Sequence, residues 1–487
     1  MSTPTKTKQL AVDTVLFGIS TFGSKILVFL LTPLYTAVLS TEEYGVADLI
    51  NTTVALIYPL LTLAISDATL RYALDKNSSK RAVIGNSILL TALSVLLLAA
   101  LYPAVAVMNA EIAVQLKEYW IYFVLTYALY NVHLCFSNYV KGIGMTKLFA
   151  VQGIVHTLSV VAGNIWFLLV AKAGLRGYLL SVIIGYIVPI LLMFVCAKLY
   201  KDLFPIKIDI PLFSKMLKYS IPMIPALLAW SINMYINKYM LIGMLDDGLA
   251  QSGIFSVANK IPSMLTAVLS IFTQAWQLSA ISNVNDADES EYYTKVYKAM
   301  HIVALVGSLV IIPLSKPLSA LLFDKDYYAA WQHIPFLTLS AFFSCLCGFL
   351  ASAFRAYEKT VQLFVSVVAG AVINVILNLV LIPTVGVIGA SIATAASFFM
   401  TWVVRMVTIR SMVKVKIRLW QTIVTYTAVI AACVMISFDL SFAYPAFAIA
   451  FALTVLLNLA DIRDIIVAAW GTFVKIIGSL KKAGNKK

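Results

Sequence analysis

The stretch YGVADLIN at Tyr44–Asn51 resembles a second stretch, SGIFSVAN at Ser252–Asn259, which lies 208 residues further along the chain. Gly45 aligns with Gly253, and both stretches end in asparagine. Two further matches follow in the same order: KGIGMTKLF (Lys141–Phe149) with RAYEKTVQLF (Arg355–Phe364), and GLRGYLLS (Gly174–Ser181) with GVIGASIA (Gly386–Ala393). Because the three matches occur in the same order in both halves, we interpret the chain as two copies of one duplicated unit.

The composition indicates that both units lie in a membrane. Of 487 residues, 61% are hydrophobic and 12% are charged, whereas soluble proteins average about 25% charged residues. A helix rises 1.5 Å per residue, so about 20 uncharged residues cross a hydrocarbon core of about 30 Å. About fourteen such runs are predicted, near 12–39, 45–66, 82–108, 119–140, 148–171, 175–197, 216–245, 250–281, 293–323, 328–354, 360–382, 386–409, 419–437 and 440–458.

The predicted fold class is therefore an all-α polytopic membrane protein with two six-helix lobes and two additional C-terminal helices. Six spans are an even number, so both lobes have the same orientation, as in transporters built from parallel repeats. We expect a first lobe at 1–205, a second lobe at 206–415, two more spans at 416–458 and a basic tail at 459–487. The tail has an amphipathic pattern, which predicts a helix on the inner leaflet.

The distribution of basic residues predicts the orientation in the membrane. Of the 36 lysines and arginines, 28 fall in alternate connections and the termini, and only five fall in the opposite connections. Because basic loops stay inside, both termini are predicted to be cytoplasmic. The net charge of +14 is then a consequence of topology and does not predict nucleic-acid binding.

The phrases LLTPLYTAVLSTEEYGVADLI (Leu30–Ile50) and AISDATLRYALD (Ala64–Asp75) resemble the opening of bacterial polysaccharide flippases. These belong to the multidrug/oligosaccharidyl-lipid/polysaccharide exporter superfamily. The resemblance implies a V-shaped bundle of two lobes in the bacterial cytoplasmic membrane. It also implies the movement of an undecaprenyl-pyrophosphate-linked oligosaccharide repeat unit from the inner to the outer leaflet.

A lysine lies in the middle of the first apolar run, at the end of GISTFGSK (Gly18–Lys25). The spelling is close to a phosphate-binding loop, but that motif needs a preceding strand, and here apolar helix is predicted on both sides. On a helix, Thr21 and Lys25 lie on one polar stripe with Thr14, Gly18, Thr32 and Thr36. A lysine at this depth costs about 2.5–3.5 kcal/mol without water or a partner, so we expect the stripe to face a cavity; an ion pair or snorkelling is the alternative.

A second polar stripe runs along the predicted span at 250–281 and begins with Lys260 beside Asn259. It continues through Ser263, Ala267, Ser270, Gln274 and Gln277. So many amides and hydroxyls are not expected to face lipid. We therefore predict a cavity lined by Lys260, Ser263 and the two glutamines, together with Asn51 and Asn259 of the duplicated stretch.

Three more cations are candidate cavity residues with a structural alternative. Lys238 follows Asn233 and Asn237 in a span that the prolines Pro222 and Pro225 are expected to kink; it lies nearer the outer face, where snorkelling competes. Arg71 follows Asp67 by one helical turn, so a local ion pair is equally expected. Arg355 ends a stripe of small polar residues, where it is a cavity cation or a flanking anchor.

A cavity of cations, amides and hydroxyls suits a large anion that carries sugars, because lysine attracts phosphate and amides bond to sugar hydroxyls. We therefore predict a lipid-linked oligosaccharide flippase with no enzymatic activity. A multidrug/cation antiporter of the same superfamily, which would need buried carboxylates, and a peptidoglycan-precursor flippase are the alternatives. Membrane lipids, a polysaccharide polymerase and glycosyltransferases are the expected partners.

Neither a cofactor nor a metal is predicted. The five cysteines all fall in apolar runs without ligand spacing, which favours packing. The four histidines show no ligand pair at helical spacing. His133 and His156 are candidates for a proton relay, although packing is favoured.

Overall fold

The computed structural model describes residues 23, 26–27, 29–282, 289–357, 359–459 and 461–463. These residues form helices and connections, with no β-strand among them, so the predicted all-α class is confirmed. Ten of the helices are long and apolar enough to cross a membrane within this described part.

The helices of the first lobe are α2 (Thr32–Val38), α3 (Thr41–Leu61), α4 (Ile65–Leu74), α5 (Lys80–Ala100), α6 (Tyr102–Ala106), α7 (Glu111–Glu118), α8 (Trp120–Gly142), α9 (Thr146–Asn164), the π-helix η1 (Ile165–Val170), α10 (Gly174–Cys196) and α11 (Leu199–Leu203). The amphipathic helix α12 (Ile210–Ser220) connects the lobes and packs on α4 and α5.

The second lobe contains α13 (Ile224–Met244), α14 (Gly248–Ala258), α15 (Lys260–Ser282), α16 (Glu289–Ile311), α17 (Ser315–Leu322), η3 (Lys325–Gln332), α18 (Ile334–Ala356), α19 (Thr360–Val385), α20 (Val387–Thr408) and η4 (Ile409–Ser411). α21 (Leu419–Ser437) and a helix at Ala443–Leu459 follow. The predicted domain limits at 205, 415 and 458 stay predictions.

Ten described helices are long and apolar enough to cross a membrane, fewer than the fourteen apolar runs predicted from the sequence. The difference has identifiable reasons. α8 and α13 are 23 and 21 residues long, but their aromatic and amide residues lower the hydropathy. Ala443–Leu459 is shorter than the other spans. Half of the predicted first span at 12–39, like all of the predicted tail after Arg463, lies outside the described residues.

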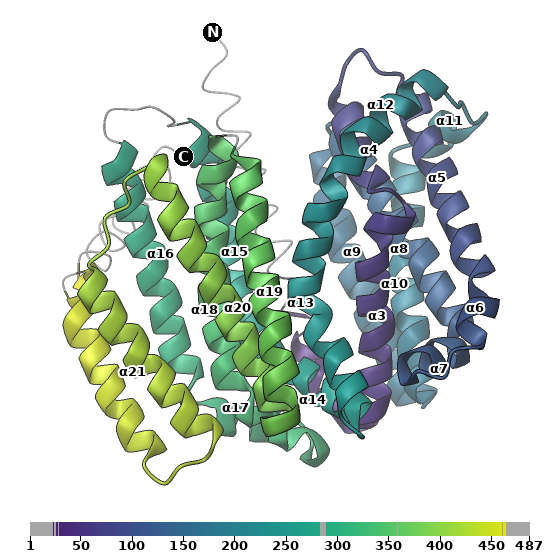
Figure 1. The fold of residues 1–487 in the computed structure, drawn as a ribbon. Coiled ribbons are helices and arrows are strands. Elements are labelled where there is room, and N and C mark those ends of the chain that lie inside the picture. The colour runs from purple at the N-terminus through teal and green to yellow at the C-terminus, as the bar shows by residue number, and fades with distance from the viewer. Residues whose placement is uncertain are drawn as a thin grey trace, which may run out of the picture.

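The two lobes lie side by side with α13 between them (Figure 1). Their ribbons diverge toward the end that carries α4 and α12, which we name the basic end. They come together at the opposite end, which carries α6, α7, α14 and α17 and which we name the outer end. Here α14 packs along α3 of the first lobe, so the contact between lobes is concentrated at one end of the molecule.

A capping box fixes where α3 begins at the outer end. The Ser40 hydroxyl accepts a hydrogen bond from the Glu43 amide at 3.1 Å, and the Glu43 carboxylate accepts one from the Ser40 amide at 2.9 Å. Such a box satisfies two backbone N–H groups that the first helical turn leaves free.

Proline shapes the entry to α13. The predicted span 216–245 is broken by a 3₁₀ turn at Ile221–Met223, so residues 216–220 belong to α12 instead. Pro222 has no N–H to continue a helical ladder, and Pro225 occupies the first turn of α13, where no such bond is needed. The prolines therefore separate the interfacial helix from the spanning one.

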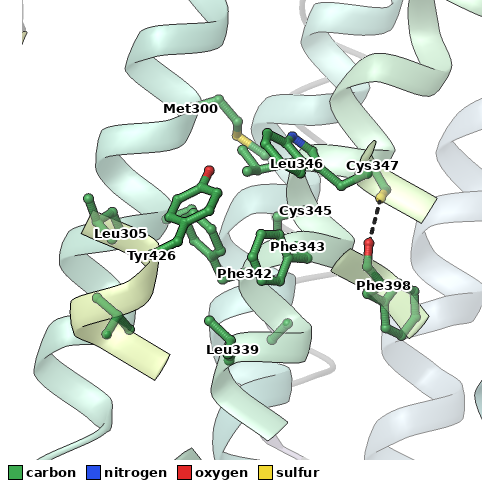
Figure 2. Close-up of a cluster of buried hydrophobic side chains, with 14 of the residues drawn as sticks. Met300, Leu305, Leu339, Phe342, Phe343, Cys345, Leu346, Cys347, Phe398 and Tyr426 are labelled. Atoms are coloured by element: carbon green, nitrogen blue, oxygen red, sulfur yellow. Dashed lines mark hydrogen bonds between the residues drawn. The ribbon is translucent and has the colours of Figure 1, made fainter. Parts of the chain in front are cut away.

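The core of the second lobe is apolar and aromatic. Phe342, Phe343 and Leu346 of α18 pack against Tyr426 of α21 (Figure 2). Cys347 lies in the same cluster, where its thiol donates a weak hydrogen bond to the Phe398 carbonyl at 3.6 Å. All five cysteines are free, and all but Cys196 are buried.

Candidate functional site

A polar cavity of about 420 Å³ lies within the second lobe between α13, α15, α18 and α20. Four of the predicted site residues line it: Asn233 and Asn237 of α13, Asn259 at the end of α14, and Ser263 of α15. Hydroxyl groups on α15 and α18 continue the polar lining, and Trp230 and Phe398 add aromatic faces. A mixture of amides, hydroxyls and aromatic rings is suited to a polyhydroxylated ligand.

An amide network fastens α13 to the rest of the second lobe. The Asn237 amide donates to the Thr394 hydroxyl at 3.0 Å, and Asn378 of α19 donates to the Asn237 carbonyl oxygen at 2.6 Å. Asn378 also donates to the Asn374 side chain at 2.5 Å, and the Ser397 hydroxyl donates to Asn233 at 2.5 Å. Because buried amides lose free energy when unpaired, this network holds α13 in one position against α19 and α20.

A second cavity of about 840 Å³ adjoins the first, and its lining includes Pro222 before α13 and Arg355 in the last turn of α18. The two cavities share Trp230, Thr273 and Gly348 in their walls. Arg355 of α18 and Arg405 of α20 line the second cavity, while most of its remaining lining is apolar. No carboxylate lines either cavity in the part of the chain that the structure describes.

An ion pair joins the two lobes at the outer end. The Lys238 ammonium of α13 lies 2.5 Å from the Asp48 carboxylate of α3, and Lys238 is only 8% exposed. The Ser256 hydroxyl of α14 donates to the same carboxylate at 2.8 Å. Lys238 therefore forms an ion pair with a carboxylate of the other lobe. From the sequence, an ion pair is one alternative to a cavity position for Lys25, whereas snorkelling is the alternative for Lys238.

The duplicated stretches themselves form the contact between α3 and α14. A Cβ on Gly45 would clash with the Leu249 carbonyl oxygen, and a Cβ on Gly253 would clash with the Thr41 carbonyl oxygen. Thr41 and Leu249 are also 208 residues apart, so the two clashes are equivalent in the repeat. The helices cross at a point where only glycine permits such close approach, and the crossing lies on the axis that relates the lobes.

Further contacts close the outer end around this crossing. The Tyr327 hydroxyl of η3 donates to the backbone carbonyls of Leu39 at 3.0 Å and Ser40 at 2.7 Å. Thr53 of α3 and Tyr239 of α13 share a hydrogen bond of 2.9 Å between their hydroxyls. Each contact joins one lobe to the other, so opening of this end requires all of them to separate.

The remaining predicted site residues are placed as follows. Lys260 is partly exposed at the start of α15, close enough to Tyr178 of the first lobe to interact electrostatically with its hydroxyl. Asn51 is partly buried and donates to the Ala47 carbonyl within α3. Arg71 is exposed on α4 and does not line either cavity. Lys25 and Thr21 lie outside the described residues, and so do the side chains of Gln274 and Gln277.

Sequence reasoning missed three polar residues of the second lobe. Asn374 and Asn378 form an i, i+4 pair within the apolar run of α19, and that spacing is the signal that predicts a shared buried face. Arg405 is one of the 28 basic residues whose distribution predicts the orientation, yet it is buried in α20. Its signal is the stripe Thr394, Ser397, Thr401 and Arg405, which follows helical spacing.

These features define a multi-pass α-helical membrane protein with two pseudo-symmetric lobes and a polar cavity within one of them. The family model described as "Polysaccharide biosynthesis protein" matches residues 10–277, more than half of the chain. The chain belongs to this family, and the resemblance found in residues 30–75 is confirmed. A search of curated proteins finds no match.

Solved structures show the same fold at low sequence identity. "Lipid II flippase MurJ, inward closed conformation" is 15% identical with a TM-score of 0.69, over 93% of this chain and 100% of that one. An inward-facing multidrug resistance MATE family transporter of the MOP superfamily is 13% identical with a TM-score of 0.62, over 80% of this chain and 95% of that one. A MATE structure in complex with MaL6 is 13% identical with a TM-score of 0.58, over 82% and 96%.

Proposed function

We propose that the protein is a flippase that moves an undecaprenyl-pyrophosphate-linked oligosaccharide repeat unit from the inner to the outer leaflet for polysaccharide biosynthesis. The observation that carries this proposal is the cavity of amides, hydroxyls and aromatic rings, which continues into a cavity with two arginines and no described carboxylate. Membership of a polysaccharide biosynthesis family supports the choice of cargo.

The arrangement of the lobes supports transport by alternating access. If the basic end faces the cytoplasm, as the excess of lysine and arginine there predicts, the lobes diverge toward the cytoplasm and the α3–α14 crossing closes the outside. The lipid-linked sugar enters from the inner leaflet, and separation of Lys238 from Asp48 then opens the outer end. The transporter works without covalent chemistry, driven by an ion gradient, the membrane potential or consumption of the exported product.

In this proposal Lys25, Lys260 and the amides of α13 bind the sugar-phosphate portion of the cargo. Replacing cationic side chains removes attraction for phosphate, because a lysine acts on phosphate as a point charge. We expect Lys25→Ala and Lys260→Ala to abolish polysaccharide export in a host that lacks its own flippase, at normal protein level. Lys76→Ala, in the exposed connection before α5, is the matched control and should export normally.

Near-wild-type polysaccharide in both cavity variants would contradict the role of these lysines. The fold is shared with MATE transporters and with a lipid II flippase, so two alternative cargoes deserve direct comparison. Drug efflux in a pump-deleted host would support a multidrug/cation antiporter, and rescue of a strain depleted of its lipid II flippase would support a peptidoglycan-precursor flippase.

A further inference from the structure

Arg405 is a buried cation that the proposed sugar cavity does not use. It is 2% exposed on α20, where its Nε donates to the Ser366 hydroxyl at 2.9 Å and its Nη1 donates to the Cys347 carbonyl at 2.6 Å. Among the described residues, no carboxylate lies within 4 Å of it. A guanidinium has five N–H donors, so neutral acceptors satisfy part of its hydrogen-bonding capacity and leave its charge uncompensated.

Arg355 places a second positive charge in the same cavity. It lies at the C-terminal end of α18, is exposed, and forms no ion pair with any residue in the described part of the chain. Two like charges that share one cavity repel each other. An anion bound between them removes that repulsion, and the oxygens of a phosphate can accept paired hydrogen bonds from the planar fork of an arginine.

The rest of the wall differs from that of a sugar site. Pro225 and Leu227 of α13 line the second cavity together with Phe364 and Val367 of α19. Val361, near the start of α19, also lines this cavity and is 69% exposed. The apolar wall of the cavity therefore continues onto the exposed face of α19, which is a candidate membrane span. Such a wall offers few hydrogen bonds to a sugar but a favourable surface to a hydrocarbon chain.

We propose that this second cavity binds the phosphate end of a polyprenyl-linked lipid when the cargo enters from the basic end, before it reaches Lys260 near the outer end. Arg355 and Arg405 then contact the pyrophosphate, and the α13–α19 wall contacts the first isoprenyl units. The inference rests on the proposed function, because it assumes that the cargo is a lipid-linked pyrophosphate. The shared residues Trp230, Thr273 and Gly348 then lie where the sugar passes into the polar cavity.

The test measures binding and does not depend on transport. The full chain in phosphatidylcholine nanodiscs is titrated with undecaprenyl pyrophosphate, with undecaprenol, which lacks phosphate, and with phosphatidylglycerol, an ordinary anionic lipid. We expect Arg355→Gln to weaken undecaprenyl pyrophosphate binding at least tenfold and to leave undecaprenol binding unchanged. Arg410→Gln, an exposed arginine on η4 near the same end, is the matched control and should bind within twofold of wild type.

Arg405→Gln is expected to weaken binding further, and Arg405→Lys to restore part of it through charge alone. Because Arg405 is buried and these variants risk misfolding, Arg355→Gln is the deciding one. Unchanged affinity in Arg355→Gln, or equal competition by phosphatidylglycerol, would overturn the inference. Selective binding that disappears in Arg355→Gln, in a protein that exports no polysaccharide, would instead support this site while contradicting the proposed transport function.

Discussion

Removal of the Asp48 charge should open the outer end of the molecule. In the present structure the Asp48 carboxylate lies 2.5 Å from the Lys238 ammonium and accepts a hydrogen bond from Ser256. Asp48→Asn keeps the size of the side chain but leaves Lys238 buried without a counter-ion. The closed arrangement then carries a penalty that separation of the lobes relieves, because separation exposes Lys238 to water.

The size of the effect follows from the burial of the pair. Breaking a fully buried ion pair by removing one partner costs about 3–5 kcal/mol. The side chains of Lys238 and Asp48 are 10% and 18% exposed, so desolvation is incomplete and about 2–3 kcal/mol is a fair expectation. At 1.4 kcal/mol per factor of ten, the equilibrium between closed and open outer ends shifts by about 30-fold to 140-fold.

Spin labels on the outer end report this shift directly. Cysteines at Asn109, in the connection before α7, and at Leu321 of α17 are exposed on different lobes, and Cys196 is the exposed native cysteine to be replaced. Pulsed electron spin resonance in nanodiscs should show one distance for the parent protein and a second, longer distance for Asp48→Asn.

The double variant Asp48→Asn/Lys238→Met should return the distribution toward the short distance, because it removes the unpaired charge. A distance distribution that Asp48→Asn leaves unchanged, in a protein that remains folded, would refute the reasoning. So would a double variant that is as open as the single one, because the effect would then not depend on the Lys238 charge.

Three other outcomes are expected. Gly45→Val should keep the outer end from closing, seen as a longer spin-label distance, because its side chain clashes with the α14 backbone; Gly243→Ala, where a Cβ meets nothing within 4 Å, is the control. Gly348→Leu, between the two cavities, should abolish export while undecaprenyl pyrophosphate still binds. A hydrogen bond from Ser78 holds the pKa of Asp75 below its usual value of 3.8. Asp75→Ala should therefore lower the melting temperature at pH 7. The difference in melting temperature between the parent protein and the variant should narrow as the pH falls below 3.8, because the carboxylate of the parent then becomes protonated.

Much of the fold was predictable because hydropathy and duplication act over whole segments. The apolar runs specify spans whatever their neighbours are, since lipid accepts only backbone that is hydrogen-bonded within itself. Part of the polar stripe that begins with Lys260 beside Asn259 was also predictable. Ser263 and Asn259 line the polar cavity, whereas Lys260 is not among the lining residues of either cavity. Helical spacing alone determines such a face.

Pairing across the lobes was not predictable from local pattern. Asp48 and Lys238 are 190 residues apart, and both were visible as charges in apolar runs, but nothing in either run specifies the other. For Arg405 the local pattern predicts the wrong environment, because a basic residue near the end of a span is expected to be an exposed anchor at the membrane interface. Its burial depends on Ser366 and Cys347 from two other helices.

The duplication explains why the outer contact is asymmetric in charge. Asp48 and Ser256 occupy the same position in the two copies, 208 residues apart, and they touch because the crossing lies on the axis between the lobes. Two identical carboxylates at this place would repel each other and hold the end open. A hydroxyl in one copy donates to the carboxylate of the other, and Lys238 neutralises the single charge. The fold follows from what the copies share, whereas the closure of the outer end follows from where they differ.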